Sequence, residues 1–334
     1  MNYELTYFKG IRSLILILIT VLIKGSLMAQ QKSFEFVVLP DTQTYVEEYP
    51  EIYLHQMRWL ANNKDRFSFA LHVGDITQNN NGKEWDIAKK GFNIIQGKLP
   101  FSFGLGNHDM GSESGKFADT RNTSLANAYF TASDFANLKT TFPEGKIDNL
   151  LSEFTIGEQK WMVLSLEFGP RNKTIAWADK MIAKYPEHNF IIVTHAYVYE
   201  DSTPHDGEDW WLPENYGIGK DTGEETPNNG AQLWEKLIKK HENISMVFSG
   251  HILKSGVGTL VSEGKNGNKV YQMLANYQKG VEGSENGGNG FLRIIKVNPE
   301  NQRIEVKTYS PWLDEFKKEK AKANDFTFKN VLFK

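Results

Sequence analysis

Short apolar segments that end next to aspartate, asparagine or histidine recur along this chain, and they constrain its fold more than any other feature. These segments are FEFVVLP (34–40), FSFALHV (67–73), PFSFGL (100–105), NFIIVT (189–194) and ISMVFS (244–249). Their length and their β-branched and aromatic residues predict buried strands. Segments with helical spacing lie at 51–62, 84–95, 174–185 and 231–241. The alternation predicts a mixed α/β protein.

The last third of the sequence has a different pattern. Gly264–Asn268 predicts a hairpin turn between GTLVSE and VYQMLAN, and FLRIIKV and RIEVKTY predict two further strands. Strands that follow one another through such short turns are antiparallel. We expect residues 30–334 to form a single domain that carries a long acidic loop at 197–229.

Polar side chains suited to metal binding follow five of the predicted strands. They are Asp41, Gly74-Asp75, Gly106-Asn107-His108-Asp109, His195 and Gly250-His251. Open α/β sheets place their ligand crevice at the carboxyl ends of the strands. One such residue alone is commonly a turn or helix-capping residue. Their coincidence at five strand ends favours one shared metal site.

The motifs PDTQ, GDIT, GNHD, TH and GH, in this order, resemble those of the calcineurin-like metallophosphoesterases. The resemblance covers nearly all of 30–334 and implies a four-layer α-β-β-α sandwich. It also implies two divalent metal ions, manganese, iron or zinc. Asp75 would bridge the ions and Asp41 would bind the first. Asn107, His195 and His251 would bind the second.

The resemblance further implies a hydrolase of phosphate monoesters or diesters. Two cations neutralise the charge of the ester and activate a water-derived hydroxide that attacks phosphorus. His108 would assist the leaving oxygen as a general acid. Asp109 would orient the imidazole of His108.

Two positions depart from the family pattern, and both concern the first metal. Gln43 stands where the family has histidine, and Leu253 stands where the last motif has its second histidine. Gln43 can offer a neutral oxygen, whereas Leu253 offers no ligand. The first site is therefore expected to be weakened, relocated or occupied by a harder ion. Asn276 and Gln278 could reach this metal or a substrate oxygen, although polar residues are also common in turns.

These departures keep a second interpretation open, in which the chain is a degenerate metallophosphoesterase scaffold that binds a ligand without turnover. The complete GNHD motif favours the enzyme, because a scaffold has little need of His108.

The composition limits the available chemistry. The 334 residues contain no cysteine, so thiolate ligands, disulfides and a cysteine nucleophile are excluded. With 38 basic and 41 acidic residues, a broad nucleic-acid or membrane-binding surface is not expected. Any metal must be bound by oxygen and imidazole ligands.

The N-terminus resembles a signal peptide. Lys9 and Arg12 precede an apolar run at 13–23 that is too short to span a bilayer. Residues 1–29 are predicted to be removed after Ala29, which leaves no stable membrane span and predicts a secreted or periplasmic protein. The alternatives are an uncleaved anchor and an envelope-bound structural or adhesion protein.

The 197–229 loop follows His195 and should overhang the site. Residues 200–225 contain nine acidic residues, one basic residue, Trp210 and Trp211. As a lid, the loop would repel polyanions and offer the two tryptophans to an apolar or sugar-like leaving group. Alternatively, it is a solvated loop whose tryptophans cover the core. The expected substrate is a small-molecule, lipid or sugar phosphoester, and the oligomeric state is left open.

His72 lies within a predicted strand, three residues before Asp75. Strand alternation places its side chain on the opposite face from Asp75. We therefore expect a packed core histidine and no metal ligand at this position.

Overall fold

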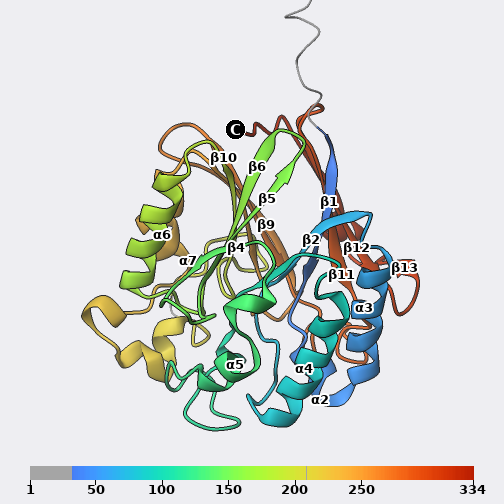
Figure 1. Cartoon of the computed structure of the whole chain (residues 1–334), viewed down its shortest axis with the longest axis vertical. Coiled ribbons are helices and arrows are strands. Elements are labelled where there is room, and N and C mark those ends of the chain that lie inside the picture. Colours follow the sequence, from blue (N-terminus) through green and yellow to red (C-terminus); the bar gives the residue numbers. More distant parts are fainter. Residues whose placement is uncertain (1–31, 208) are drawn as a thin grey trace, which may run out of the picture.

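The computed structural model describes residues 32–207 and 209–334 (Figure 1). Its strands are β1 (Phe34–Leu39), β2 (Phe67–His72), β3 (Phe101–Phe103), β4 (Leu138–Thr141), β5 (Leu150–Ile156), β6 (Gln159–Ser165), β7 (Asn189–Val193), β8 (Ile244–Ser249), β9 (Val257–Glu263), β10 (Lys269–Ala275), β11 (Leu292–Asn298), β12 (Arg303–Ser310), β13 (Glu315–Phe316) and β14 (Asp325–Lys329). Its α-helices are α2 (Gln43–Glu48), α3 (Pro50–Asn62), α4 (Gly82–Ile95), α5 (Ser124–Tyr129), α6 (Asn172–Lys184), α7 (Gly230–Lys236) and α8 (Ala321–Asn324).

The strands form two seven-stranded sheets. The first has the order β13-β12-β11-β1-β2-β3, with β14 also paired to β12, and the second has the order β4-β5-β6-β7-β8-β10-β9. β1, β2 and β3 are mutually parallel, as are β6, β7, β8 and β10. The carboxyl ends of β1, β2 and β3 therefore meet at one edge of the first sheet, and those of β7 and β8 meet at one edge of the second.

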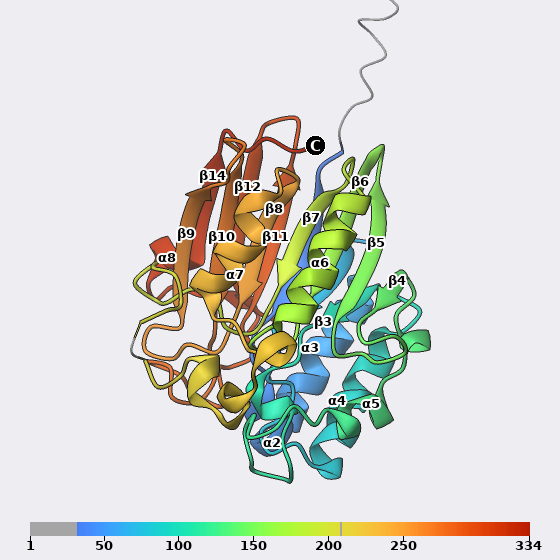
Figure 2. The same ribbon diagram turned by 90° about the vertical axis from the view of Figure 1, so that its left-hand side faces the viewer.

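Helices cover the outer faces of the two sheets. α3 and α4 pack on the first sheet through a core that includes Leu60, Trp85 and Phe92. α6 and α7 pack on the second sheet through a core that includes Ile182 and Leu233, and Figure 2 shows them in front of its strands. The result is the predicted four-layer α-β-β-α sandwich, and the prediction of a mixed α/β fold is confirmed.

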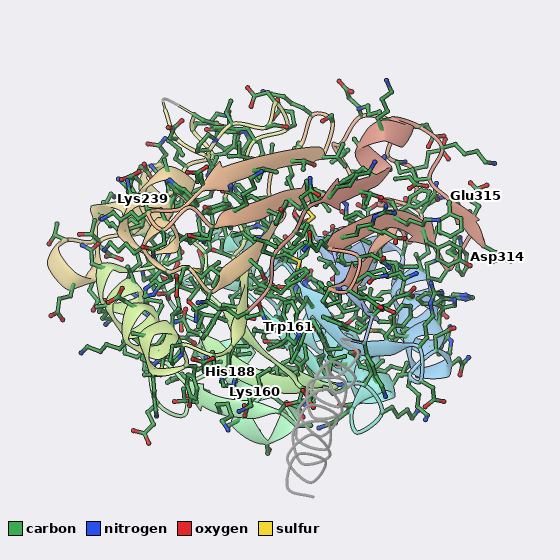
Figure 3. All side chains as sticks on the ribbon, turned by 90° about the horizontal axis from the view of Figure 1, so that it is seen from above. Lys160, Trp161, His188, Lys239, Asp314 and Glu315 are labelled. Atoms are coloured by element: carbon green, nitrogen blue, oxygen red, sulfur yellow. The ribbon has the colours of Figure 1, made fainter. Side chains whose placement is uncertain are left out.

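A third core fills the space between the sheets. β1 and β2 are buried on both faces, so alternate residues point to the helices and to the opposite sheet. Phe36 and Phe69 stack at 4.5 Å between ring centroids on the inner face. Trp161 of β6 also belongs to this core, with its ring 5.1 Å from that of Phe34. Figure 3 views the molecule from above Figure 1, onto the end of the sheets near the C-terminus, and labels Trp161.

Several element boundaries differ from the sequence prediction. The helix predicted at 231–241 ends at Lys236 as α7, and a short 3-10 turn follows at Ile238–Lys240. Leu237 separates the two with non-helical backbone angles. The sequence pattern also missed β5, which pairs antiparallel with β6 and adjoins β4 at the sheet edge.

The predicted signal peptide, 1–29, lies outside the described residues. Within 32–207 and 209–334, no helix is both long and apolar enough to cross a membrane.

Candidate metal centre

The polar residues at the five strand ends converge between the two sheets. Asp41 follows β1, Asp75 follows β2 and Asn107 follows β3, whereas His195 and His251 follow β7 and β8 of the other sheet. All five side chains are at least 98% buried. Figure 1 places α2, which begins two residues after Asp41, at the end of the molecule opposite the C-terminus.

Asp75, His195 and His251 form the tightest group. Their candidate ligand atoms all lie within 4.8 Å of one another, and His195 Nε2 is 3.1 Å from Asp75 Oδ2. His195 Nδ1 donates to the Val73 carbonyl at 3.0 Å, which leaves Nε2 directed at the carboxylate. His251 Nε2 donates to the Trp211 carbonyl at 2.9 Å, which leaves Nδ1 as its free nitrogen. Backbone carbonyls thus set the ring orientations, as is typical around metal-binding histidines.

Three further oxygen atoms also indicate a metal site. Within the described part of the chain, Asp41 Oδ1, Gln43 Oε1 and Asn107 Oδ1 are buried and have no hydrogen-bond partner. Leaving a buried polar atom unpaired costs about 1–3 kcal/mol. Carboxylate and amide oxygens beside imidazole nitrogens are the donors that divalent cations bind in proteins. The residues present therefore fit a divalent metal centre.

The ionisable groups perturb one another strongly. Burial raises the pKa of Asp41 to about 8, an effect only partly offset by His195. Burial opposes ionisation of Asp75 as well, but His195 and His108 outweigh it and hold its pKa below the usual range. Burial alone would lower the pKa of His195, yet Asp75 and Asp41 raise it to about 9. Burial, followed by repulsion from His195, keeps the pKa of His251 well below its ordinary value.

The backbone around these ligands is unusual. Asp75 has a φ of 51° and His251 a φ of 71°, in the left-handed region that non-glycine residues seldom adopt. Such strain is concentrated at functional sites. Glycines provide the neighbouring space, because a Cβ on Gly106 would overlap Asp75 Oδ1 and one on Gly250 would overlap Asp41 Oδ1. The glycine before each ligand thus allows two strand ends to approach closely.

His108 stands at the edge of this group. Its Nε2 lies 4.0 Å from Asp75 Oδ2, its backbone N–H donates to Asp75 Oδ1 at 3.0 Å, and its ring lies 4.0 Å from that of Phe117. The ring is oriented by the Gln78 carbonyl, 2.7 Å from Nδ1.

Asp109 was expected to orient His108, and the structure gives its carboxylate hydrogen bonds to other partners. Asp109 accepts hydrogen bonds from the backbone N–H groups of Gly106, Ile76 and Thr77 and from the Thr77 hydroxyl. These hydrogen bonds link the loop after β3 to the loop after β2. Burial raises the pKa of Asp109 to about 6, with Asp75 contributing.

Residues 34–255 match the sequence profile of the Calcineurin-like phosphoesterase family. The chain belongs to this family. Over 304 residues it is 25% identical to the uncharacterized protein YvnB of Bacillus subtilis, which covers 88% of this chain and 21% of YvnB. The chain thus spans about a fifth of the length of that curated relative.

Two solved structures align with most of this chain. The purple acid phosphatase PPD1 of yellow lupin aligns with a TM-score of 0.55 and 11% identity, over 90% of this chain and 54% of that one. The NAD nucleotidase NadN of Haemophilus influenzae aligns with a TM-score of 0.47 and 13% identity, over 86% and 54%.

In this calcineurin-like chain, a cavity of about 310 Å³ opens onto the candidate metal centre. Its lining includes Asp75, Asn107, His108, Trp211 and Gln278. Gln43 and Leu253 also line it. Leu253, which replaces a family histidine, therefore places an aliphatic side chain beside the centre.

Four residues were predicted to bind substrate: Asn276, Gln278, Trp210 and Trp211. Only Gln278 and Trp211 line the cavity. Gln278 lines the cavity and donates to Asp41 Oδ2 at 3.2 Å, whereas Asn276 is fully buried and accepts the backbone N–H of Gln278. Trp211 lines the cavity, but Trp210 does not; its ring lies 4.0 Å from that of Trp211 and is 65% exposed. The acidic loop thus reaches the metal centre through Trp211.

Sequence reasoning missed Glu84, which organises the loop beside His108. This carboxylate, in the first turn of α4, accepts the backbone N–H groups of Gln78 and Asn79 at 2.9 and 2.7 Å. It also accepts the side-chain amides of Asn79 and Asn81. The Gln78 carbonyl that holds His108 is thereby fixed. The Asn81-x-x-Glu84 capping pattern was the available signal.

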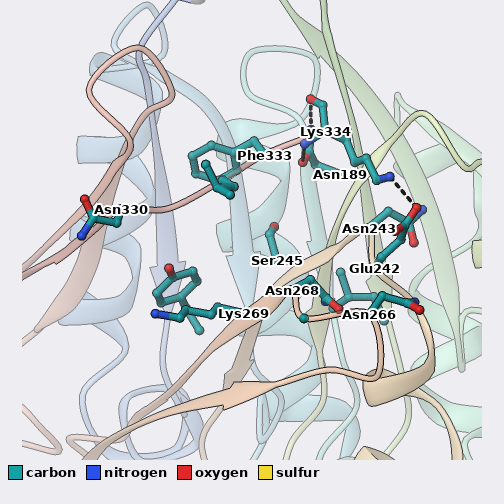
Figure 4. A pocket seen from close by; sticks show the side chains of 14 residues that line it. Asn189, Glu242, Asn243, Ser245, Asn266, Asn268, Lys269, Asn330, Phe333 and Lys334 are labelled. Carbon is teal, nitrogen blue, oxygen red and sulfur yellow. Dashed lines mark hydrogen bonds and ion pairs between the residues drawn. The ribbon is translucent and has the colours of Figure 1, made fainter.

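A second cavity lies near the C-terminus, at the other end of the sandwich (Figure 4). It has a volume of about 450 Å³ and is lined by amides such as Asn189, Asn243 and Asn268. Its acidic lining residue, Glu242, is paired with Lys334. Donor chemistry, and not cavity size, therefore selects the candidate site.

His72 is fully buried, as predicted for a core histidine. Its Nδ1 accepts the Gly74 N–H at 3.1 Å, so its Nε2 carries the proton and donates to Thr42 Oγ1 at 2.9 Å. Both ring nitrogens are thus used in linking the β1 and β2 loops. Burial lowers the pKa of His72 to about 3.

This shift predicts acid destabilisation. Unfolded His72 binds a proton near pH 6.5, but the folded ring stays neutral down to about pH 3, so stability falls as the pH drops through this window. In urea unfolding of metal-free protein, His72→Gln should lose about 2 kcal/mol less than the native chain between pH 7.5 and 5.0. Equal losses in the two proteins would contradict this assignment.

Proposed function

We propose that this chain is an exported, divalent-metal-dependent hydrolase of phosphate esters. The observation that carries the proposal is the buried group of Asp75, His195 and His251, surrounded by the unpaired oxygens of Asp41, Gln43 and Asn107. A merely structural cluster would pair these atoms with one another. Family membership supports the same reaction class.

The side chains have distinct roles in this proposal. Asp75 would be shared between two ions, with Asp41 and Gln43 on one side and Asn107, His195 and His251 on the other. Bound divalent ions would supply charge neutralisation of the phosphate and lower the pKa of water. The Val73 and Trp211 carbonyls hold the imidazoles in place, so the site is organised before substrate enters.

His108 would assist the leaving group. It lines the cavity, lies outside the tight ligand group, and has its Nδ1 committed to the Gln78 carbonyl. Its Nε2 is therefore the nitrogen that, in the imidazolium form of the ring, would donate a proton to the departing oxygen. This role requires the ring to stay beside Asp75, which the Phe117 contact supports.

We expect His108→Ala to lower kcat by about 10²–10⁴-fold for a poor leaving group such as an alkyl phosphate. The loss should be much smaller for p-nitrophenolate, which departs without a proton. Metal content should remain unchanged. His55→Ala, on α3 away from the cavity, is the control. A loss that is equal for both leaving groups would refute the leaving-group role.

The substrate is proposed to be a small phosphoester from a nucleotide, sugar or lipid headgroup. The cavity of about 310 Å³ matches such a size, and Trp211 provides an aromatic wall. Glu47, Glu48 and Lys279 also line it, and Lys279 pairs with Glu48 at 2.7 Å, so Glu47 is the acidic lining residue that would disfavour a substrate with several uncompensated phosphates.

The direct test is hydrolysis of p-nitrophenyl phosphate and bis-p-nitrophenyl phosphate by purified protein, with metal content measured in parallel. Turnover that disappears on chelation and returns with divalent ions would support the enzyme. Bound metal without turnover of either ester would instead support the non-catalytic scaffold.

Export is part of the proposal and depends on the predicted signal peptide at 1–29. N-terminal sequencing of protein recovered from an expressing culture tests it, and a mature chain that starts after Ala29 is expected. Retention of residue 1 in the recovered protein would favour the membrane anchor.

A further inference from the structure

We propose that the two metal positions of this chain are chemically unequal: the first is an all-oxygen site for an exchangeable hard cation, and the second retains a transition-metal ion. The inference rests on the proposed function for the presence of two ions. It goes further by assigning a different ion class and a different affinity to each position.

The second position has mixed donors. His195 Nε2 and His251 Nδ1 supply two imidazole nitrogens, and both rings are oriented through their other nitrogen. Asn107 Oδ1 and the Asp75 carboxylate supply oxygen. Two imidazoles with oxygen ligands suit zinc, iron or manganese.

The first position offers oxygen alone. Asp41 has one oxygen, Oδ2, held by the His251 backbone N–H at 3.0 Å and the Gln278 amide at 3.2 Å. Its Oδ1 has no partner among the described residues, and Gln43 Oε1, two residues along the chain, has none either. With Asp75, these atoms form a set of carboxylate and amide oxygens, which magnesium, calcium and manganese prefer.

The missing imidazoles are not supplied by His72, Leu253 or Gln278. The histidine nearest in the β2 strand, His72, has both nitrogens engaged by Thr42 and Gly74. Leu253 lines the cavity with an aliphatic side chain. Gln278 donates its amide to Asp41, and its own backbone N–H is held by Asn276. Gln278 would thus be a positioning residue that holds Asp41 through Oδ2 and leaves Oδ1 available to the first ion.

The inference predicts two classes of metal in one protein. After dialysis against metal-free buffer, purified protein loaded with zinc should retain about one ion per chain. Manganese added to this form should occupy the first position weakly and reversibly, and magnesium should compete with it. Neither measurement needs substrate. Elemental analysis gives the retained zinc per chain, and the electron paramagnetic resonance signal of free manganese gives the manganese affinity.

Three variants assign the two classes. Gln43→His/Leu253→His restores two nitrogens and should raise retained zinc from about one to about two per chain. Gln43→Leu removes one oxygen and should weaken manganese binding by about 10–100-fold without changing retained zinc. His251→Ala should release the tightly held zinc. Circular dichroism and melting temperature check that each variant is folded.

The outcomes separate this inference from the proposed function. Two zinc ions retained by the native chain, or unchanged manganese affinity in Gln43→Leu, would overturn the unequal sites even if the protein hydrolyses esters. The predicted metal behaviour without hydrolysis would leave the unequal sites standing and refute the enzyme. A folded double variant that retains one zinc would also contradict the inference.

Discussion

Replacing Asp75 by asparagine is expected to reduce phosphoester hydrolysis by at least about 10³-fold. The neutral amide would lose one charged oxygen from a position shared by two ions, and a loss of about 4 kcal/mol in transition-state stabilisation corresponds to that factor. The side chain is nearly isosteric, and the His108 N–H could still donate to its oxygen, as it does to Asp75 Oδ1. The measurement is kcat/KM together with metal content per chain.

The control for this variant is Asp65→Asn, which makes the same chemical change at a side chain that is 91% exposed and lies outside the cavity. It should retain native activity and metal content. Asp75→Asn should also lower the pKa of His195 in metal-free protein, because Asp75 is the main group that raises it. Native activity in a folded Asp75→Asn protein would refute the proposed centre.

Metal binding is expected to raise the melting temperature by about 6 °C. In the metal-free chain, two carboxylates and two imidazoles are buried together, and Asp41 Oδ1, Gln43 Oε1 and Asn107 Oδ1 have no partner among the described residues. Ions that bind only the folded state at 1,000 times their dissociation constant stabilise it by about 4 kcal/mol. A chain of about 300 residues gains roughly 1.6 °C per kcal/mol.

Thermal unfolding with a chelator, and then with zinc or manganese, measures this effect. The His195→Ala/His251→Ala variant is the matched control, because it removes both imidazoles of the second position. Its melting temperature should rise far less with zinc. A metal-independent melting temperature in the native chain would show that these residues do not form a metal centre.

Much of the fold could be predicted from local sequence. Strands such as β1, β2 and β8 are short, apolar and buried on both faces, which is a strong local signal. β5 was missed because its segment lies at the sheet margin, where β6 and β4 hold it in place. The end of α7 at Lys236 was also missed, because apolar spacing continues through Leu237 and Ile238 while the backbone turns.

The candidate ligands could be identified from the sequence because each follows a strand, and parallel strands bring their ends together. Their supporting contacts could not. The ring of His108 is held by the Gln78 carbonyl, and that of His251 by the Trp211 carbonyl. Every residue has a backbone carbonyl, so the sequence does not show which carbonyl will accept a hydrogen bond from a given imidazole. Backbone N–H groups are equally common, so the sequence did not show that Asp109 accepts those of Gly106, Ile76 and Thr77.

The sequence by itself thus determined the family, the layered fold and the kinds of donor atom, because these depend on residue type and on spacing along the chain. The tertiary structure alone decided which atoms face one another. It placed Gln278 against Asp41 across 237 positions, selected Trp211 over Trp210 for the cavity, and left Gln43 Oε1 without a partner among the described residues. These outcomes depend on how loops from two sheets pack, and local patterns do not encode that packing.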